Sequence, residues 1–171
     1  MDWSQSTDYM NLLNNKLAFP FINNDLVLFS GEIYKINRYW TTQKRILCVT
    51  SKYILNLKRD KYKLDKNNKP DLTGLWCKRI IDIKDLGGVT TSLHRKSFEF
   101  VIHVPKEYDY RYDTQNQKIR KEIIDAIKLA YLSTCKDSLK IYGVPNKYLG
   151  QYTKNSNSRS KVLKIPDSKY I

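Results

Sequence analysis

The apolar side chains of this chain change their period once, near residue 113, and that change limits the folds open to it. Over residues 97–104 a large apolar side chain occupies every second position, which is typical of a strand with one buried face. Over residues 119–131 an Ile or Tyr recurs every four positions, with charged residues between. This second pattern predicts one amphipathic helix over residues 114–134, with a capping box that begins at Thr114.

All the segments with strand character precede that helix. Only two residues, Ser51 and Lys52, separate two of these segments, which predicts a hairpin there. Six or seven strands followed by one helix predict an α+β fold, in which an antiparallel sheet or barrel is capped by the C-terminal helix. The β-branched and aromatic content predicts strands over residues 26–36, 45–50, 53–57, 75–81, 89–93 and 97–104, with a candidate edge strand over 108–112.

Three parts of the chain differ in character. Residues 26–134 carry the strands and the helix, and 171 residues are enough for one such domain with its own core. Residues 1–25 are a polar N-terminal extension, in which apolar residues four positions apart predict a short helix before Pro20. Residues 135–171 are rich in Lys, Tyr and Asn and interrupted by Gly and Pro, so we expect a basic, extended C-terminal tail.

The charge of the chain points to an acidic partner. Its 31 Lys and Arg residues against 17 Asp and Glu residues give a formal net charge of +14. The densest basic stretch spans residues 58–69, and clustered like charges repel one another unless a partner neutralises them. The alternative is an ordinary solvated, lysine-rich loop. On the first interpretation this stretch contributes four side chains to an anionic partner: Lys58, Arg59, Lys61 and Lys63.

The sequence carries no motif of an enzyme. A phosphate-binding loop, a dinucleotide fingerprint and a nucleophile elbow do not occur in it. Neither His94 nor His103 has a Cys at metal-ligand spacing, and we expect His103 at the surface, on the polar side of its strand. We therefore predict that the chain is not an enzyme and that it uses no catalytic residue, metal or cofactor.

Other features predict where the chain works. Its three Cys residues are far apart, which is typical of reduced thiols in an intracellular protein. No apolar run approaches the roughly 20 residues that cross a bilayer, and the start of the chain has no secretory signal. We therefore expect a cytoplasmic protein without a transmembrane segment.

Several segments in the middle of the chain resemble a known family in their order and spacing. These segments are residues 27–38, 43–57, 78–90 and 98–104, and the predicted helix follows them. Together they resemble the tail-homology domain of class I myosins, which belongs to the pleckstrin-homology-like superfamily. The resemblance implies a twisted antiparallel sheet capped by a helix, and it includes no motor segment.

The resemblance also implies a binding site. Some members of that superfamily bind acidic phosphoinositide headgroups through basic residues of the first strand, the following loop and the second strand. Lys44 and Arg45 are adjacent, and neighbouring side chains of a strand point to opposite faces, so the two do not both reach one headgroup. Trp40, at the tip of the loop, suits an interface with a membrane or a protein. By position, the resemblance assigns headgroup binding to Lys35, Arg38, Lys44 and Arg45.

Two classes of function fit these features, and the sequence favours a protein interface. Charge spread over domain and tail, with 13 Tyr and 3 Trp residues, favours a non-enzymatic scaffold that docks on an acidic cytoskeletal assembly. A microtubule or an axoneme is the best candidate, which would place the chain on the cytoskeleton, for example in a cilium. The alternative is a peripheral membrane module that binds anionic phospholipid or phosphoinositide. A weaker alternative is an RNA-associated structural protein.

Overall fold

The computed structural model describes residues 7–13, 22, 25–59, 66–67 and 75–155. In these residues nine strands form one sheet, in the order β5-β4-β3-β2-β8-β7-β6-β9, with β1 paired beside β2. The strands are β1 (Thr7–Asp8), β2 (Val27–Ile36), β3 (Thr42–Thr50), β4 (Tyr53–Arg59), β5 (Leu75–Asp82), β6 (Gly88–Ser92), β7 (Glu99–His103), β8 (Tyr110–Asp113) and β9 (Ile141–Val144). The helices of the described part are α1 (Gln117–Cys135) and two short 3-10 helices, η3 (Ile83–Asp85) and η4 (Gly150–Tyr152).

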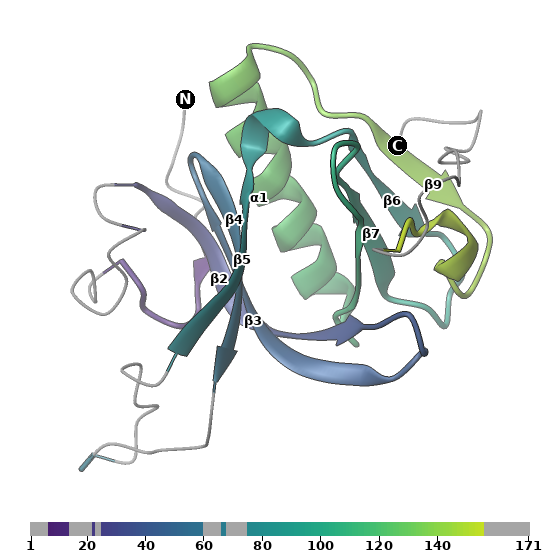
Figure 1. Ribbon diagram of the computed structural model, residues 1–171, viewed down its shortest axis with the longest axis horizontal. Helices are drawn as coiled ribbons and strands as arrows, with labels where there is room; N and C mark the ends of the chain where they lie inside the picture. The colour runs from purple at the N-terminus through teal and green to yellow at the C-terminus, as the bar shows by residue number, and fades with distance from the viewer. Residues whose placement is uncertain (1–6, 14–21, 23–24, 60–65, 68–74, 156–171) are drawn as a thin grey trace.

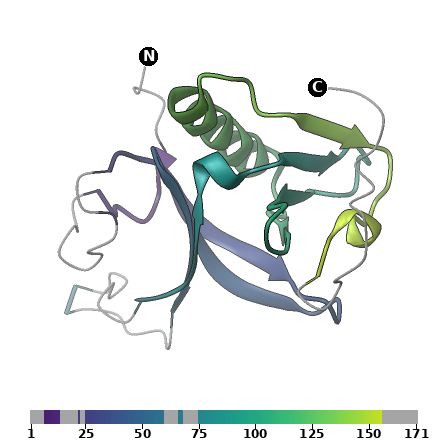
Figure 2. The ribbon, with the colours of Figure 1, turned by 45° about the horizontal axis from the view of Figure 1, so that its top comes forward.

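The ten-residue strand β2 belongs to both halves of the sheet. Near its start Phe29 pairs in parallel with Thr7 of β1, and near its end Tyr34 pairs antiparallel with Asp113 of β8. Figure 1 shows β2 to β5 on one side of the molecule and β6, β7 and β9 on the other. Figure 2, turned by 45°, shows α1 at one end of these two layers. The molecule therefore has the expected α+β architecture, a bent sheet capped by one helix, and this helix follows β1 to β8 and precedes β9 in the chain.

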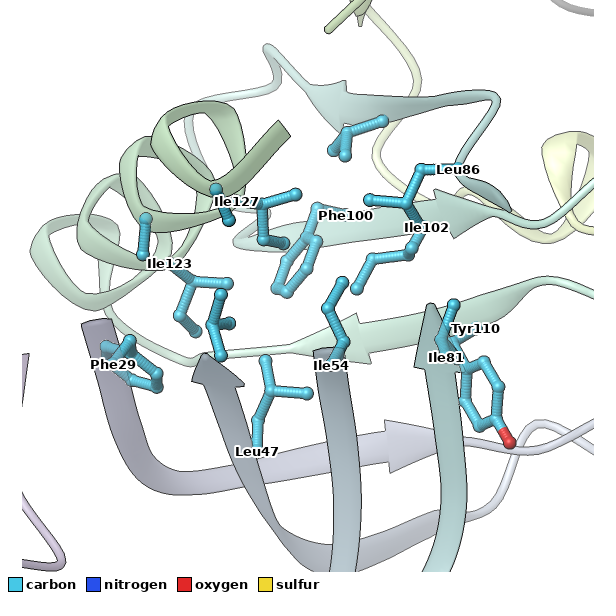
Figure 3. Close-up of a cluster of buried hydrophobic side chains, with 14 of the residues drawn as sticks. Phe29, Leu47, Ile54, Ile81, Leu86, Phe100, Ile102, Tyr110, Ile123 and Ile127 are labelled. Atoms are coloured by element: carbon cyan, nitrogen blue, oxygen red, sulfur yellow. The ribbon is translucent and has the colours of Figure 1, made fainter. Parts of the chain in front are cut away.

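The main hydrophobic core fills the space between the two layers and the helix (Figure 3). Burying each of its large side chains stabilises the fold by roughly 1.5–3 kcal/mol relative to exposure. The core therefore joins elements that are far apart in the chain. Its fully buried members include Phe29, Leu47, Ile54, Phe100, Ile102 and Ile127.

The helix is present where the four-residue period predicts it. Its buried stripe consists of Ile123, Ala126, Ile127 and Ala130. It begins three residues later than expected, because Asn116 is the N-cap and its side-chain oxygen accepts a hydrogen bond from the Ile119 amide at 3.1 Å. At the other end, Lys136 adopts a left-handed conformation with φ of 57°, which ends the helix.

Strand β8 occupies the middle of the sheet, which differs from the edge position predicted for residues 108–112. It lies between β2 and β7, and Phe100 pairs with Tyr112. The predicted edge position came from charged side chains that alternate with tyrosines, a pattern that usually marks a solvated face. Here the chain that follows α1 returns and covers that face, so the charged side chains are buried.

The segment after α1 also differs from the extended tail predicted for residues 135–171. Strand β9 pairs in parallel with β6, with Val89 opposite Ile141, and η4 follows it. Val144 and Leu149 of this segment pack with Val101 in a small cluster on the outer face of β7. We call residues 139–155 the strap. Residues 156–171 lie outside the described residues.

The N-terminal part covers a different outer face. The carboxylate of Asp8 accepts hydrogen bonds from the Leu12 and Leu13 amides at 2.9 and 2.8 Å, which shapes a turn directly after β1. Leu12 then packs with Leu55 and Leu57 in a second apolar cluster. Residues 7–13 are thus a short strand and a turn. Most of the helix predicted before Pro20 lies outside the described residues.

Candidate anion-binding site

The register of four strands brings basic side chains together on the inner face of the sheet. Paired residues of neighbouring strands point to the same face, and Ile33, a core residue, pairs with Arg45. Lys35 lies two positions beyond Ile33 on β2, so it shares this face with Arg45.

Strands β4 and β5 complete the group. Asn56 pairs with Leu47 of the core on one side and with Arg79 on the other, which places Arg79 on the inner face. Lys58 follows Asn56 by two residues on β4 and therefore has the same orientation. We call these four residues the inner basic cluster: Lys35, Arg45, Lys58 and Arg79.

Tyrosines line the inner basic cluster on the side of β8. The Nζ of Lys35 lies 5.0 Å from the ring centroid of Tyr110, and the guanidinium carbon of Arg79 lies 4.1 Å from Tyr108 and 4.4 Å from Tyr110. The two phenol oxygens are 3.3 Å apart. Figure 3 shows Tyr110 at the rim of the apolar core, with its oxygen pointing away from it. The cations thus rest on aromatic faces, which attract them and hold them in place.

The electrostatics of the cluster favour an added anion. Burial lowers the pKa of the Lys35 ammonium group, and the nearby charges of Arg45 and Arg79 lower it further, while Tyr108 partly opposes them. Among the described residues, the one carboxylate paired with this cluster is Glu107, which bonds to Arg79. Positive charge is therefore in excess on this face.

Three buried polar atoms beside the cluster have no hydrogen-bond partner. They are the Nε of Arg79, the hydroxyl oxygen of Tyr112 and the Oδ1 of Asn56. Burial raises the pKa of the Tyr112 hydroxyl, with Tyr110 contributing to the rise, so this phenol stays neutral and can donate. Buried polar groups normally have partners, so unpartnered ones beside cations mark a place where a polar ligand would add bonds.

The other residues predicted for this site lie elsewhere. Lys44 points to the opposite face of β3, as the alternation predicts, and its Nζ lies 3.0 Å from Glu32. Arg38 lies in the β2–β3 turn and stacks on Tyr39, with the guanidinium carbon 4.7 Å from the ring centroid. Arg59 is the last residue of β4, and Lys61 and Lys63 lie outside the described residues. The structure therefore brings together Lys35, Arg45 and Lys58 of the eight predicted basic residues.

Arg79 is the member that the sequence-based assignment omitted. A β-bulge between β4 and β5 changes the register after Asn56, so that Arg79 and Trp76 both point to the inner face. Sequence alternation alone does not reveal such a bulge. The available signal was the basic pair at residues 78–79, which leads into an apolar turn in the segment that resembles the myosin tail.

A second group of charged side chains lies on the outer face, under the strap. Arg111 makes two bonds of 2.8 Å to the carboxylate of Glu99, which also accepts the Leu149 amide at 2.9 Å. The carboxylate of Asp109 lies 3.0 Å from His103 and accepts the Lys154 amide at 3.0 Å. We call these four side chains the outer network: Glu99, His103, Asp109 and Arg111.

The surface position predicted for His103 is wrong. Only 1% of this residue is exposed, and its second ring nitrogen lies 2.6 Å from the hydroxyl of Thr90. The strap covers the strand face on which it lies. Every polar group of this imidazole therefore has a partner within the fold.

These geometries define what the protein surface can do chemically. The inner basic cluster offers ammonium and guanidinium groups on a rigid sheet, which suits a phosphate or another polyvalent anion. In the residues that the structure describes, no three His, Cys, Asp or Glu side chains come together in a way that could hold a metal ion. No helix in this part of the chain is long and apolar enough to span a bilayer.

The amino-acid sequence matches the family described as the unconventional myosin tail, actin- and lipid-binding, over residues 4–146. This range includes β1 to β9 and α1. A comparison with curated proteins finds no match.

Comparison with solved structures shows the fold. Vav1 bound to an allosteric inhibitor matches with a TM-score of 0.50 and 12% identity, over 70% of this chain and 32% of that chain. The C-terminal PH domain of pleckstrin has a TM-score of 0.47 and 19% identity, over 63% and 99% of the two chains. The Slm1 PH domain in complex with inositol-4-phosphate has a TM-score of 0.46 and 14% identity, over 60% and 93%. The chain thus spans only 18% to 32% of the first Vav1 structures it matches.

Proposed function

This chain belongs to the unconventional myosin tail family, and we propose that it binds anionic phospholipid through the inner basic cluster, with a phosphorylated inositol headgroup as the preferred ligand. The observation that carries this proposal is the excess of cations on the inner face. Lys35 and Arg45 share this face with Arg79, and the Nε of Arg79 is buried without a partner. A phosphate between them would accept several charge-assisted hydrogen bonds.

This proposal reverses the ranking drawn from the sequence. The family description names actin and lipid, and the matched Slm1 PH domain holds inositol-4-phosphate. Neither names microtubules or cilia, so we rank the membrane surface first. The net charge of +14 adds a general attraction to an acidic leaflet, of about 1 kcal/mol for each basic residue near the surface.

Actin is the second candidate partner, because the family description names it. Actin filaments are acidic polymers, so the same net charge of +14 suits them. With either partner the chain works as a binding module in the cytoplasm. It attaches to the membrane, to the cytoskeleton or to both.

Adjacent residues on β3 provide a matched test of the lipid site. Arg45→Gln and Lys44→Gln remove the same charge from opposite faces of one strand. Removing a charge from the general attraction should weaken vesicle binding about fivefold in either variant. If the inner basic cluster holds the headgroup, Arg45→Gln should lose at least about tenfold more vesicle affinity than Lys44→Gln, because a charge-assisted hydrogen bond to the headgroup is also lost.

The measurement is co-sedimentation with three kinds of vesicle: phosphatidylcholine alone, phosphatidylcholine with phosphatidylserine, and phosphatidylcholine with a phosphatidylinositol bisphosphate at matched surface charge. The proposal predicts the tightest binding to the third kind, and a gap between the two variants that is largest there. Equal losses in both variants would show that only net charge matters. Pelleting with actin filaments and with none of the vesicles would replace the lipid proposal by the actin one.

A further inference from the structure

Three aromatic side chains stand exposed where the β2–β3 turn meets the strap. Tyr39 is 69% exposed, Trp40 58% and Tyr148 53%. The Trp40 and Tyr148 rings lie edge to face, with centroids 5.8 Å apart. Figure 1 shows the strap, in yellow-green, beside the turn that joins β2 to β3, and Figure 2 shows the same neighbourhood after rotation. We call Tyr39, Trp40 and Tyr148 the aromatic platform.

The outer network holds the aromatic platform from below. The guanidinium carbon of Arg111 lies 4.2 Å from the Trp40 ring, and Arg111 is itself fixed by its two bonds to Glu99. Glu99 also accepts the Leu149 amide, next to Tyr148, so one buried ion pair positions both segments. Gly150 allows close packing here, because a Cβ at this position would lie 2.7 Å from the Trp40 ring.

Trp40 packs on Arg111 and Tyr148, yet 58% of the residue stays exposed. Its backbone adopts a φ of 65°, a left-handed conformation that is costly for a residue with a side chain. The turn accounts for this conformation, because the Trp40 amide donates to the Asn37 carbonyl and the Thr41 amide donates to the Asn37 side chain, at 3.0 Å each. The exposed surface of a ring fixed in this way is therefore what a partner can contact. A rigidly presented aromatic side chain costs little entropy when it binds.

The surroundings of the aromatic platform identify the chemistry of that partner. Arg38 stacks on Tyr39, and the Nζ of Lys147 lies 5.1 Å from the Tyr148 ring centroid. Neither residues 37–41 nor residues 145–149 contain an acidic residue. Trp and Tyr beside Lys and Arg are the residues that occupy the headgroup region of a bilayer, where rings contact acyl chains and cations contact phosphates.

We propose that the aromatic platform inserts into the headgroup region of an anionic bilayer, as a second contact beside the inner basic cluster. The proposal rests on the lipid-binding function above. Lys35 lies on β2 only two residues before the turn begins, so one membrane surface can meet both sites. The strap, which follows the capping helix, thereby becomes part of the binding surface.

The first test uses Trp40 as its own reporter. The variant Trp3→Phe with Trp76→Phe leaves Trp40 as the single tryptophan and changes no residue of the platform. Mixing it with vesicles of phosphatidylcholine and a phosphatidylinositol bisphosphate should shift its emission to shorter wavelength. Brominated acyl chains in those vesicles should quench the emission. Vesicle binding with unchanged emission would overturn the insertion.

The second test separates this inference from the proposed function. Trp40→Ala with Tyr148→Ala should weaken vesicle binding at least about tenfold, because both rings leave the bilayer. Binding of the water-soluble inositol bisphosphate headgroup, measured by calorimetry, should be unchanged. The control Leu132→Ala removes an exposed apolar side chain, 44% exposed, from α1 and should change neither.

Each outcome of these tests has one meaning. If the parent chain binds neither headgroup nor vesicles, the proposed function itself fails. If it binds both and the double variant loses neither, the insertion alone fails. Loss of headgroup binding in the double variant would show that the platform supports the fold, and it would overturn the insertion. In that case retained vesicle binding in the variant Trp40→Phe with Tyr148→Phe would not restore the inference. An emission shift with actin filaments and none with vesicles would assign the platform to a protein partner.

Discussion

The inner basic cluster and the outer network lie on opposite faces of the same sheet and are paired in opposite ways. In the outer network the two carboxylates are buried, and each accepts hydrogen bonds from one charged or aromatic side chain and from a main-chain amide of the strap. In the inner basic cluster, the one described carboxylate partner of the four cations is Glu107, which bonds to Arg79, and two of the cations, Lys35 and Arg79, rest on tyrosine rings. The first group has its partners within the chain, and the second has a surplus of charge.

This difference separates a structural role from a binding role. A buried charge with all its bonds made inside the protein is costly to separate from its partner, and a ligand gains nothing by approaching it. Cations in excess on a rigid face repel one another, and an anion relieves that repulsion. The comparison predicts that changes in the outer network cost stability, whereas changes in the inner basic cluster cost affinity.

Breaking the Glu99–Arg111 pair should have the largest effect. Arg111→Met would leave a buried carboxylate without its charged partner, which typically costs about 3–5 kcal/mol. Thermal and urea unfolding of the variant would measure the loss in the free energy of unfolding. A loss below about 1 kcal/mol would mean that this pair behaves as an exposed one, and the contrast between the two faces would disappear.

The double variant Glu99→Leu with Arg111→Met is the matched control. It removes both charges together, so no buried charge is left unpaired, and the loss should be smaller than that of Arg111→Met alone. The Leu149 amide loses its acceptor in the double variant, which keeps part of the cost. A double variant less stable than the single one would contradict this account of the pair.

Removing the charge of Asp109 should have a smaller effect. Its carboxylate accepts the Val104 amide at 3.1 Å and the Lys154 amide at 3.0 Å, in addition to its contact with His103. Asp109→Asn keeps one acceptor oxygen and turns the other atom into a donor, so the expected loss is about 2 kcal/mol. Hydrogen exchange should show faster exchange at Lys154, at the end of the strap, than in the strands of the core. Uniform acceleration would show that the strap is not anchored at this carboxylate.

Much of this architecture could be predicted from the sequence, because it depends on local patterns. The period of α1 and the alternation of β7 indicate which side chains the main core buries. Each of these patterns lies within one continuous segment of the chain. The two-residue turn at Ser51 and Lys52 fixes the β3–β4 hairpin in the same way. The opposite orientations of Lys44 and Arg45 also follow from alternation alone.

The remaining features depend on contacts between distant segments. Alternating charges in β8 predicted an exposed face, since nothing in residues 108–112 reveals that the strap will cover it. His103 was assigned to the surface for the same reason, although its partners Thr90 and Asp109 lie 13 and 6 residues away. Arg79 reaches the inner face through a β-bulge that a single sequence does not show. In each case a partner from elsewhere in the chain decides the outcome.

The smallest expected effect is a gain in stability when one charge of the inner basic cluster is removed. It is also the most direct test of the difference between this cluster and the outer network. Burial lowers the pKa of Lys35 in the folded protein, and the charges of Arg45 and Arg79 lower it further, so folding disfavours its charged form. Lys35→Met keeps the aliphatic stem and removes the charge. At about pH 7 the variant should be more stable than the parent chain, by less than about 1 kcal/mol for a half-exposed group.

The pH dependence of that gain tests its origin. A group whose pKa is lower in the folded state than in the unfolded state binds fewer protons when folded. The charged form of Lys35 therefore lowers the free energy of unfolding fully at low pH. This unfavourable contribution fades as the pH rises towards 10.5, the ordinary lysine pKa. The difference in unfolding free energy between Lys35→Met and the parent chain should therefore shrink as the pH rises from about 7 to about 10. Burial raises the pKa of Tyr110 and of Tyr112, so both phenols stay neutral in the folded state over this range and the difference reports on Lys35. A variant that is less stable than the parent at neutral pH would show that the contact of Lys35 with Tyr110 outweighs repulsion, and that this face, like the outer one, is balanced without a ligand.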